Sequence, residues 1–207
     1  LAKDLLEQIV FEARDSEYID AKSGVSARLS ISAFENLLST AERRAILSGD
    51  SETMIRLNDF DGIIPAITGK VELVYEGEQE GAQVVAETLI RRAIKTLFPT
   101  YFPEIKKLEK QDAETPYDDI ISWFFNSKED FELLDDYAEE AYKNELDKIK
   151  PLDVFLKEHQ PNMNKADAYF VKEFVLWALV EFKKLSKYRF AERTQFKDPY
   201  GNFINGL

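Results

Sequence analysis

The sequence contains no cysteine and only one histidine, His159. The lack of cysteine excludes disulfides and thiolate metal sites, and it fits a protein of the reducing cytoplasm, where we expect this one. A single histidine also excludes His-based metal clusters. It leaves no plausible set of residues for Ser-His-Asp or Cys-His catalysis. His159 lies near the end of a helical pattern and two residues before Pro161, so we expect it to have a surface or capping role.

Glycine and proline are also scarce, with eight and seven residues in a chain of 207. Segments rich in Ala, Leu, Glu and Lys dominate, and this composition predicts an all-α fold. No apolar run approaches the roughly 20 residues that a membrane-spanning helix needs, so we expect no membrane span. The first residue, Leu1, already belongs to a helical pattern with no methionine before it, and this N-terminal segment does not have the pattern of a signal peptide. We therefore expect the chain to be part of a longer protein.

The net charge of −12 is concentrated in the middle of the chain. Residues 109–147 contain fourteen Asp or Glu and only three Lys. Such an acidic surface repels phosphate backbones, so the sequence predicts no binding to nucleic acid. The simplest interpretation of the acidic residues is that they cover solvated helix faces.

The first half of the sequence reads as a series of helices with short interruptions. Apolar residues have helical spacing over residues 1–18, and a polar break follows. A second amphipathic helix carries a capping-box pattern, Ser32 followed by Glu35, and ends at Gly49. A short helix is predicted over 57–67. The alternating pattern of residues 71–75 is ambiguous, because a single strand would have no partner here.

The helical pattern of residues 82–98 is closed by Pro99 and Pro103, which we take as a domain boundary. The sequence thus predicts a helical domain over 1–98 and a second helical unit over 99–207. In the second unit, helices are predicted over four segments and a turn with a loose tail over 198–207; the helical segments are 116–126, 127–149, 151–159 and 165–190. The last of these is the most hydrophobic and is expected in the core of a helical bundle.

One segment, "ITGKVEL", superficially resembles a phosphate-binding P-loop. A P-loop has a glycine five residues before the Gly-Lys glycine and a Ser or Thr after the lysine. Here those positions hold Ile64 and Val71. We therefore predict no catalytic residue in this chain, and no ATP hydrolysis by the chain alone.

A more informative pattern is "SGVSARLS", in which Gly24, Ser26 and Arg28 form Gly-x-Ser-x-Arg at the start of a helix. With the helix before it, the amphipathic helix after it, and the "NDFDGIIPAITGK" segment, this order resembles the C-terminal lid of AAA+ ATPases. The resemblance is to the magnesium-chelatase and MoxR-like branch and covers roughly residues 1–98. That branch commonly has His-Arg where this chain has Gly69-Lys70, so Lys70 receives no role.

The resemblance implies that Arg28 is the sensor 2 arginine, which contacts the γ-phosphate of ATP. ATP and Mg would then be bound in the longer protein, with the lid's partners being its own AAA+ core, the neighbouring subunits of a ring, and an unidentified protein client. The plainer interpretation is that Arg28 is a surface arginine and that the chain is a helical protein-interaction module with no nucleotide link. The double arginines Arg43-Arg44 and Arg91-Arg92 are expected on solvated faces.

Overall fold

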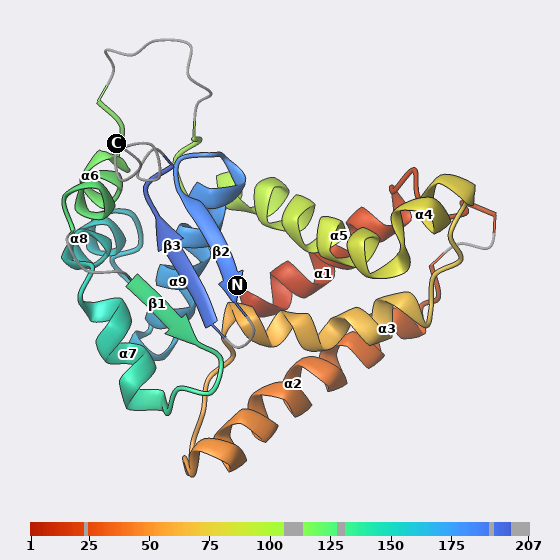
Figure 1. The fold of residues 1–207 in the computed structure, drawn as a ribbon, viewed down its shortest axis with the longest axis horizontal. Helices are drawn as coiled ribbons and strands as arrows, with labels where there is room; N and C mark the ends of the chain where they lie inside the picture. The colour runs from red at the N-terminus through yellow and green to blue at the C-terminus, as the bar shows by residue number, and fades with distance from the viewer. Residues whose placement is uncertain (23–24, 106–113, 128–130, 191–192, 200–207) are drawn as a thin grey trace. The chain divides into compact units, whose positions relative to one another are not determined.

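A computed structural model describes residues 1–22, 25–105, 114–127, 131–190 and 193–199 (Figure 1). Helices dominate, and a small three-stranded sheet accompanies them. The fold is therefore broadly helical, and the prediction of a strictly all-α fold is wrong. No helix of the described ranges has both the length and the apolar character needed to cross a bilayer.

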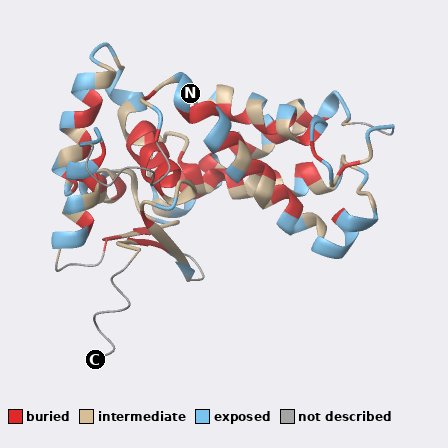
Figure 2. Cartoon of the chain, turned by 90° about the horizontal axis from the view of Figure 1, so that it is seen from above, coloured by how far each residue is buried: buried red, intermediate tan, exposed pale blue. Residues whose placement is uncertain are grey.

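The chain forms two compact units. Unit 1 contains residues 1–43 and 55–97, and unit 2 contains residues 44–54 and 98–207. The sequence-based division into 1–98 and 99–207 stays a prediction. In each unit, the buried residues concentrate along the inner faces of the helices (Figure 2).

Unit 1 is built around two long helices, α1 (Ala2–Arg14) and α5 (Ala82–Leu97), which pack against each other. Their apolar residues recur every three or four positions, so each helix buries one stripe. The buried side chains of these two helices are Leu5, Leu6, Ile9, Val10, Ala13, Val85, Ala86, Leu89, Ile90, Ala93, Ile94 and Leu97.

Helix α2 (Arg28–Ser48) starts four residues before the predicted capping-box serine, Ser32, which lies inside the helix. Its buried face is formed by Leu29, Ala33, Leu37 and Ala41. The helix ends where predicted, because Gly49 adopts a positive φ of 76° that side chains with a Cβ disfavour.

Three short helices complete unit 1: η1 (Leu57–Ile63), α3 (Ile64–Thr68) and α4 (Tyr75–Glu80). Pro65 lies in the first turn of α3, where its missing N–H leaves no intrahelical bond unmade. The ambiguous segment before α4 pairs through a single antiparallel bridge, Ile19 with Leu73.

Among its described residues, unit 2 contains the 3-10 helix η2 (Phe98–Thr100) and four α-helices. These are α6 (Asp118–Asn126), α7 (Glu139–Asp147), α8 (Lys150–His159) and α9 (Lys165–Glu181). Helix α9 is buried almost all round from Phe170 to Leu179, as its hydrophobicity predicts. Phe98 joins this core, with its ring centroid 5.8 Å from that of Phe174.

The sheet of unit 2 has the order β1-β3-β2, with both pairings antiparallel. Its strands are β1 (Phe131–Leu134), β2 (Ser186–Phe190) and β3 (Arg193–Lys197). Phe131 of β1 pairs with Phe196 of β3, and both side chains are buried. The helices predicted over 127–149 and 165–190 are therefore wrong at β1 and β2. Strand β1 pairs with the distant β3, strand β2 forms a hairpin with β3, and these pairings override the local helical pattern.

Candidate functional site

Arg28, the residue that the sequence pattern singles out, is the first residue of α2. The backbone N–H of Arg28 donates to the hydroxyl oxygen of Ser26 at 3.2 Å, and the N–H of Leu29 donates to the carbonyl oxygen of Ser26 at 2.9 Å. These bonds satisfy N–H groups that a helix start otherwise leaves without partners. Ser26 and Arg28 are exposed, whereas Leu29 is completely buried and anchors the first turn. The third member of the motif, Gly24, lies outside the described residues.

The surroundings of Arg28 favour an anion. The first turn of α2 contains no acidic residue, and the positive end of the helix dipole lies there. The Arg28 guanidinium forms no hydrogen bond or ion pair with any residue that the structure describes. Because a guanidinium presents a planar fork of donors, this position suits a phosphate group.

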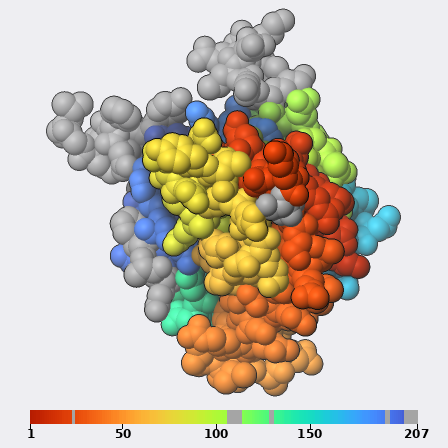
Figure 3. All heavy atoms as spheres, turned by 90° about the vertical axis from the view of Figure 1, so that its right-hand side faces the viewer, coloured from red at the N-terminus to blue at the C-terminus, as the bar shows by residue number. Residues whose placement is uncertain are grey.

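The polar break that precedes Arg28 is tied to the segment before α4. The Asp20 N–H donates to the Glu72 carbonyl oxygen at 2.8 Å, and the Val74 N–H donates to the Tyr18 carbonyl oxygen at 3.1 Å. Gly77 is required here, since a Cβ at this position would lie 2.4 Å from the Tyr18 carbonyl oxygen. Figure 3 shows the polar break that follows α1 (red) beside α4 (yellow). The start of the break is thereby held in place within unit 1.

Of the arginine pairs that the sequence places on solvated faces, Arg43-Arg44 and Arg91-Arg92, one member is buried. Arg44 is buried, with its guanidinium donating to Thr53 Oγ1 at 3.0 Å and to the Met54 carbonyl oxygen at 2.7 Å. The prediction for Arg44 is therefore wrong, because it lies on the inner face of α2 and binds the loop that follows. Arg43, its neighbour, is exposed.

The Gly69-Lys70 pair is not placed like a P-loop. Gly69 caps the C-terminal end of α3, whereas the glycines of a P-loop precede a helix. Among the residues that the structure describes, no group of three or more His, Asp or Glu side chains could hold a metal ion.

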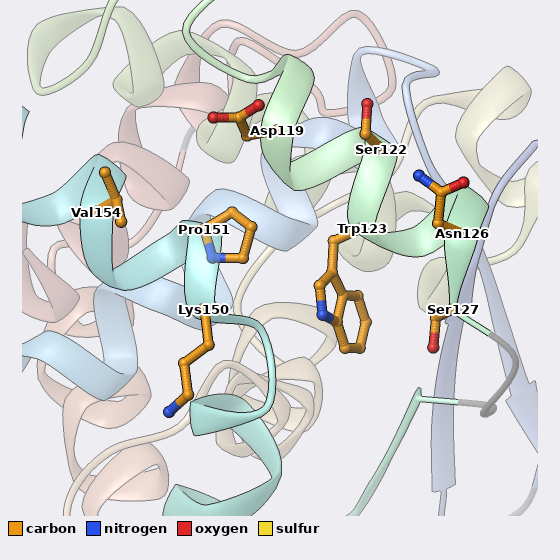
Figure 4. Close-up of a pocket in the computed structure, with 8 residues that line it drawn as sticks. All are labelled: Asp119, Ser122, Trp123, Asn126, Ser127, Lys150, Pro151 and Val154. Atoms are coloured by element: carbon orange, nitrogen blue, oxygen red, sulfur yellow. The ribbon is translucent and has the colours of Figure 1, made fainter.

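A groove between α6 and α8 was not predicted from the sequence (Figure 4). Its volume is about 560 Å³, and its apolar lining is formed by Trp123, Pro151 and Val154. The polar groups along it are Asp119, Ser122, Asn126, Ser127 and Lys150. No sequence signal could have located it, because α6 and α8 are separated by a strand and a helix.

A second unpredicted feature is an ion-pair cluster centred on Lys172, whose side chain is buried. Its ammonium lies 2.5 Å from Asp147 Oδ1 and 2.6 Å from Asp153 Oδ1, so it joins α9 to α7 and α8. The Tyr169 hydroxyl also donates to Asp147, at 3.0 Å. Burial acts to raise the pKa of Asp147, but the Lys172 ammonium and the Tyr169 hydroxyl hold that pKa below its usual value. Because the cluster ties α9 to α7 and α8, we interpret it as structural.

His159 is the last residue of α8 and is partly buried, with its ring centroid 4.5 Å from that of Phe155. It packs against its own helix.

Comparisons with protein-family models, with curated proteins and with solved structures found no match.

Proposed function

We propose that this chain is the C-terminal lid region of an AAA+ ATPase of the magnesium-chelatase or MoxR-like branch. In this account unit 1 senses bound ATP through Arg28, and unit 2 contacts neighbouring subunits or a protein client. The chain itself is not the site of hydrolysis, because the P-loop and the Mg ligands belong to the AAA+ core of a longer protein.

The observation that carries the proposal is the exposure of Arg28 and its position at the start of α2. It is exposed, it lies at the positive end of a 21-residue helix, and no acidic residue shares its first turn. An arginine in this setting gains most from a multiply charged anion such as the γ-phosphate. The helix order of unit 1, with a polar break between two amphipathic helices and a short helix after them, supports the same interpretation.

ATP would stabilise one orientation of the lid relative to its core, because the γ-phosphate contact exists only while the nucleotide is intact. Loss of that contact on hydrolysis would release the lid. A change in nucleotide then becomes a change in subunit geometry, which is how a ring could act on a client.

The test begins with the coding sequence upstream of Leu1. The proposal expects a P-loop followed by a strand that ends in acidic residues, and the expressed longer protein should hydrolyse ATP. The 207-residue chain alone should be well folded, strongly helical by circular dichroism, and inactive. An upstream region without a P-loop would overturn the proposal.

A second candidate is a helical protein-interaction module with no nucleotide link. The groove between α6 and α8 favours it, since an apolar groove with a polar rim is typical of surfaces that bind another polypeptide. Two observations distinguish the candidates. The second candidate expects no nucleotide-binding motif upstream of Leu1, and it expects substitution of Arg28 to have no effect on activity.

A further inference from the structure

Helix α2 exposes a row of large apolar side chains in unit 1. Ile31, Phe34 and Leu38 are 60%, 44% and 40% exposed, and their spacing of three and four residues places them on one face. Glu35 and Glu42 lie on the same face, at three residues before and four residues after Leu38. Neither glutamate forms an ion pair with a described residue. The α2 ridge, formed by these five residues, is thus apolar with acidic flanks.

Helix α8 of unit 2 carries two exposed lysines at matching spacing, beside the exposed Glu158. Val154 is 62% exposed at the edge of the groove, and Lys150 and Lys157 are exposed four residues before it and three residues after it. Both lysines lack an ion pair within the described ranges. Beside Val154, Trp123 and Pro151 line the apolar part of the groove (Figure 4).

The two patterns are complementary when the helices run in opposite directions. Glu35, Leu38 and Glu42 span about 10 Å along α2, and Lys150, Val154 and Lys157 span the same length along α8. An antiparallel alignment that sets Leu38 against Val154 brings Glu42 to Lys150 and Glu35 to Lys157. In a parallel alignment each charge pair would be offset by one residue, about 1.5 Å along the helix axis, so the antiparallel alignment gives the more exact match.

We propose that the α2 ridge of one copy of this chain docks antiparallel to α8 of a second copy, with Leu38 entering the α6–α8 groove. The contact uses a different surface on each copy, so it is head-to-tail and can extend or close into a ring. It gives a surface to the subunit contact of unit 2 in the proposed function and rests on that part of it, but it does not depend on a nucleotide or on Arg28. The net charge of −12 opposes association of two copies, so the contact is weak between isolated chains.

Site-specific cross-linking tests the proposal, and the absence of cysteine from the chain makes it unambiguous. A Leu38→Cys chain is mixed with a Val154→Cys chain under mild oxidation, and covalent dimers are quantified on non-reducing gels. Docking should raise the initial rate of mixed-dimer formation by about tenfold over a matched mixture, because it raises the local thiol concentration. The matched mixture combines Leu38→Cys with Val84→Cys, which replaces an exposed valine of α5.

Charge reversal provides the second arm. Lys150→Glu in the Val154→Cys chain should slow cross-linking roughly two- to fivefold, the range for an exposed ion pair, and Glu42→Lys in the other chain should restore the rate. Lys165→Glu, an exposed change on α9, should have no effect. Equal rates in the two mixtures, Leu38→Cys chains that cross-link mainly with one another, or a lack of rescue by Glu42→Lys would each overturn the proposal.

Discussion

The hydroxyl oxygen of Ser26 accepts the backbone N–H of Arg28 at 3.2 Å, two residues along the chain. This bond fixes the first residue of α2, and the guanidinium of Arg28 forms no hydrogen bond or ion pair with a described residue. The serine of the motif therefore supplies an acceptor at the start of the helix that Arg28 begins. Ser26 has a structural task, and Arg28 is available for a ligand.

Ser26→Ala should destabilise unit 1, because it leaves an N–H group at the start of α2 without its acceptor. The expected loss in the free energy of unfolding is about 1 kcal/mol, as for other helix-capping serines. Urea unfolding followed by circular dichroism measures it. Ser39→Ala, an exposed change in the middle of the same helix, is the control and should be neutral or slightly stabilising. Equal effects of the two changes would show that Ser26 does not cap α2.

Gly77→Ala should be more damaging, since the new Cβ would lie 2.4 Å from the carbonyl oxygen of Tyr18. A backbone atom cannot move aside cheaply, so we expect a loss of about 1–3 kcal/mol in the free energy of unfolding. Gly69→Ala is the matched control, because the nearest atom to its Cβ would be 3.1 Å away. A Gly77→Ala protein with unchanged stability would contradict the close approach of α4 to the end of α1.

Tyr142→Phe tests the buried polar pair of unit 2. The Tyr142 hydroxyl donates to Glu173 Oε2 at 2.7 Å, and both residues are almost fully buried. Removing a donor to a buried carboxylate should lower the free energy of unfolding by about 1.5–3 kcal/mol. Tyr75→Phe, at a position 70% exposed, should change it by less than about 0.5 kcal/mol. Similar thermal midpoints for the two variants would refute this account of the pair.

The Lys172 cluster should make part of the stability of unit 2 depend on pH. The pKa of Asp147 is lowered in the folded protein from its usual value of 3.8, so its contribution is present above about pH 4 and is lost as the pH falls through the lowered pKa. Asp147→Asn should therefore reduce the free energy of unfolding by about 1 kcal/mol at pH 7, discounted for the partial exposure of the carboxylate.

As the pH falls below about 4, the difference in stability between the Asp147→Asn protein and the unsubstituted protein should shrink. Glu7→Gln, an exposed change on α1, serves as the control and should give parallel curves throughout. A stability difference for Asp147→Asn that is constant from pH 7 to pH 2 would show that the ionised carboxylate contributes nothing.

Much of the helical structure could be predicted from the sequence, because local apolar spacing decides where an amphipathic helix buries its face. Helix α5 lies where the pattern of residues 82–98 places it, and Gly49 ends α2 as expected. The start of α2 was placed too late, because Ser32 and Glu35 form a capping-box pattern that Ser26 overrides.

The sheet could not be predicted in this way. Phe131 pairs with Phe196, 65 residues along the chain, and the periodicity around either residue carries no trace of the other. The α6–α8 groove is equally non-local. At the candidate site, the sequence pattern located Arg28, but its lack of a described hydrogen-bond or ion-pair partner and its place as the first residue of α2 needed the coordinates.

The central claim is that Arg28 binds the γ-phosphate of ATP, and the turnover rate of the longer protein tests it most directly. Arg28→Ala should leave the fold intact and lower the rate of ATP hydrolysis by about 30- to 1000-fold, or ~2–4 kcal/mol of transition-state stabilisation. Arg28→Lys should restore little, because a point charge replaces a planar fork. Arg43→Ala, at an exposed position on the same helix, should hydrolyse ATP at the unsubstituted rate. Unchanged hydrolysis by the Arg28→Ala protein would contradict the sensor role and leave Arg28 as a surface arginine.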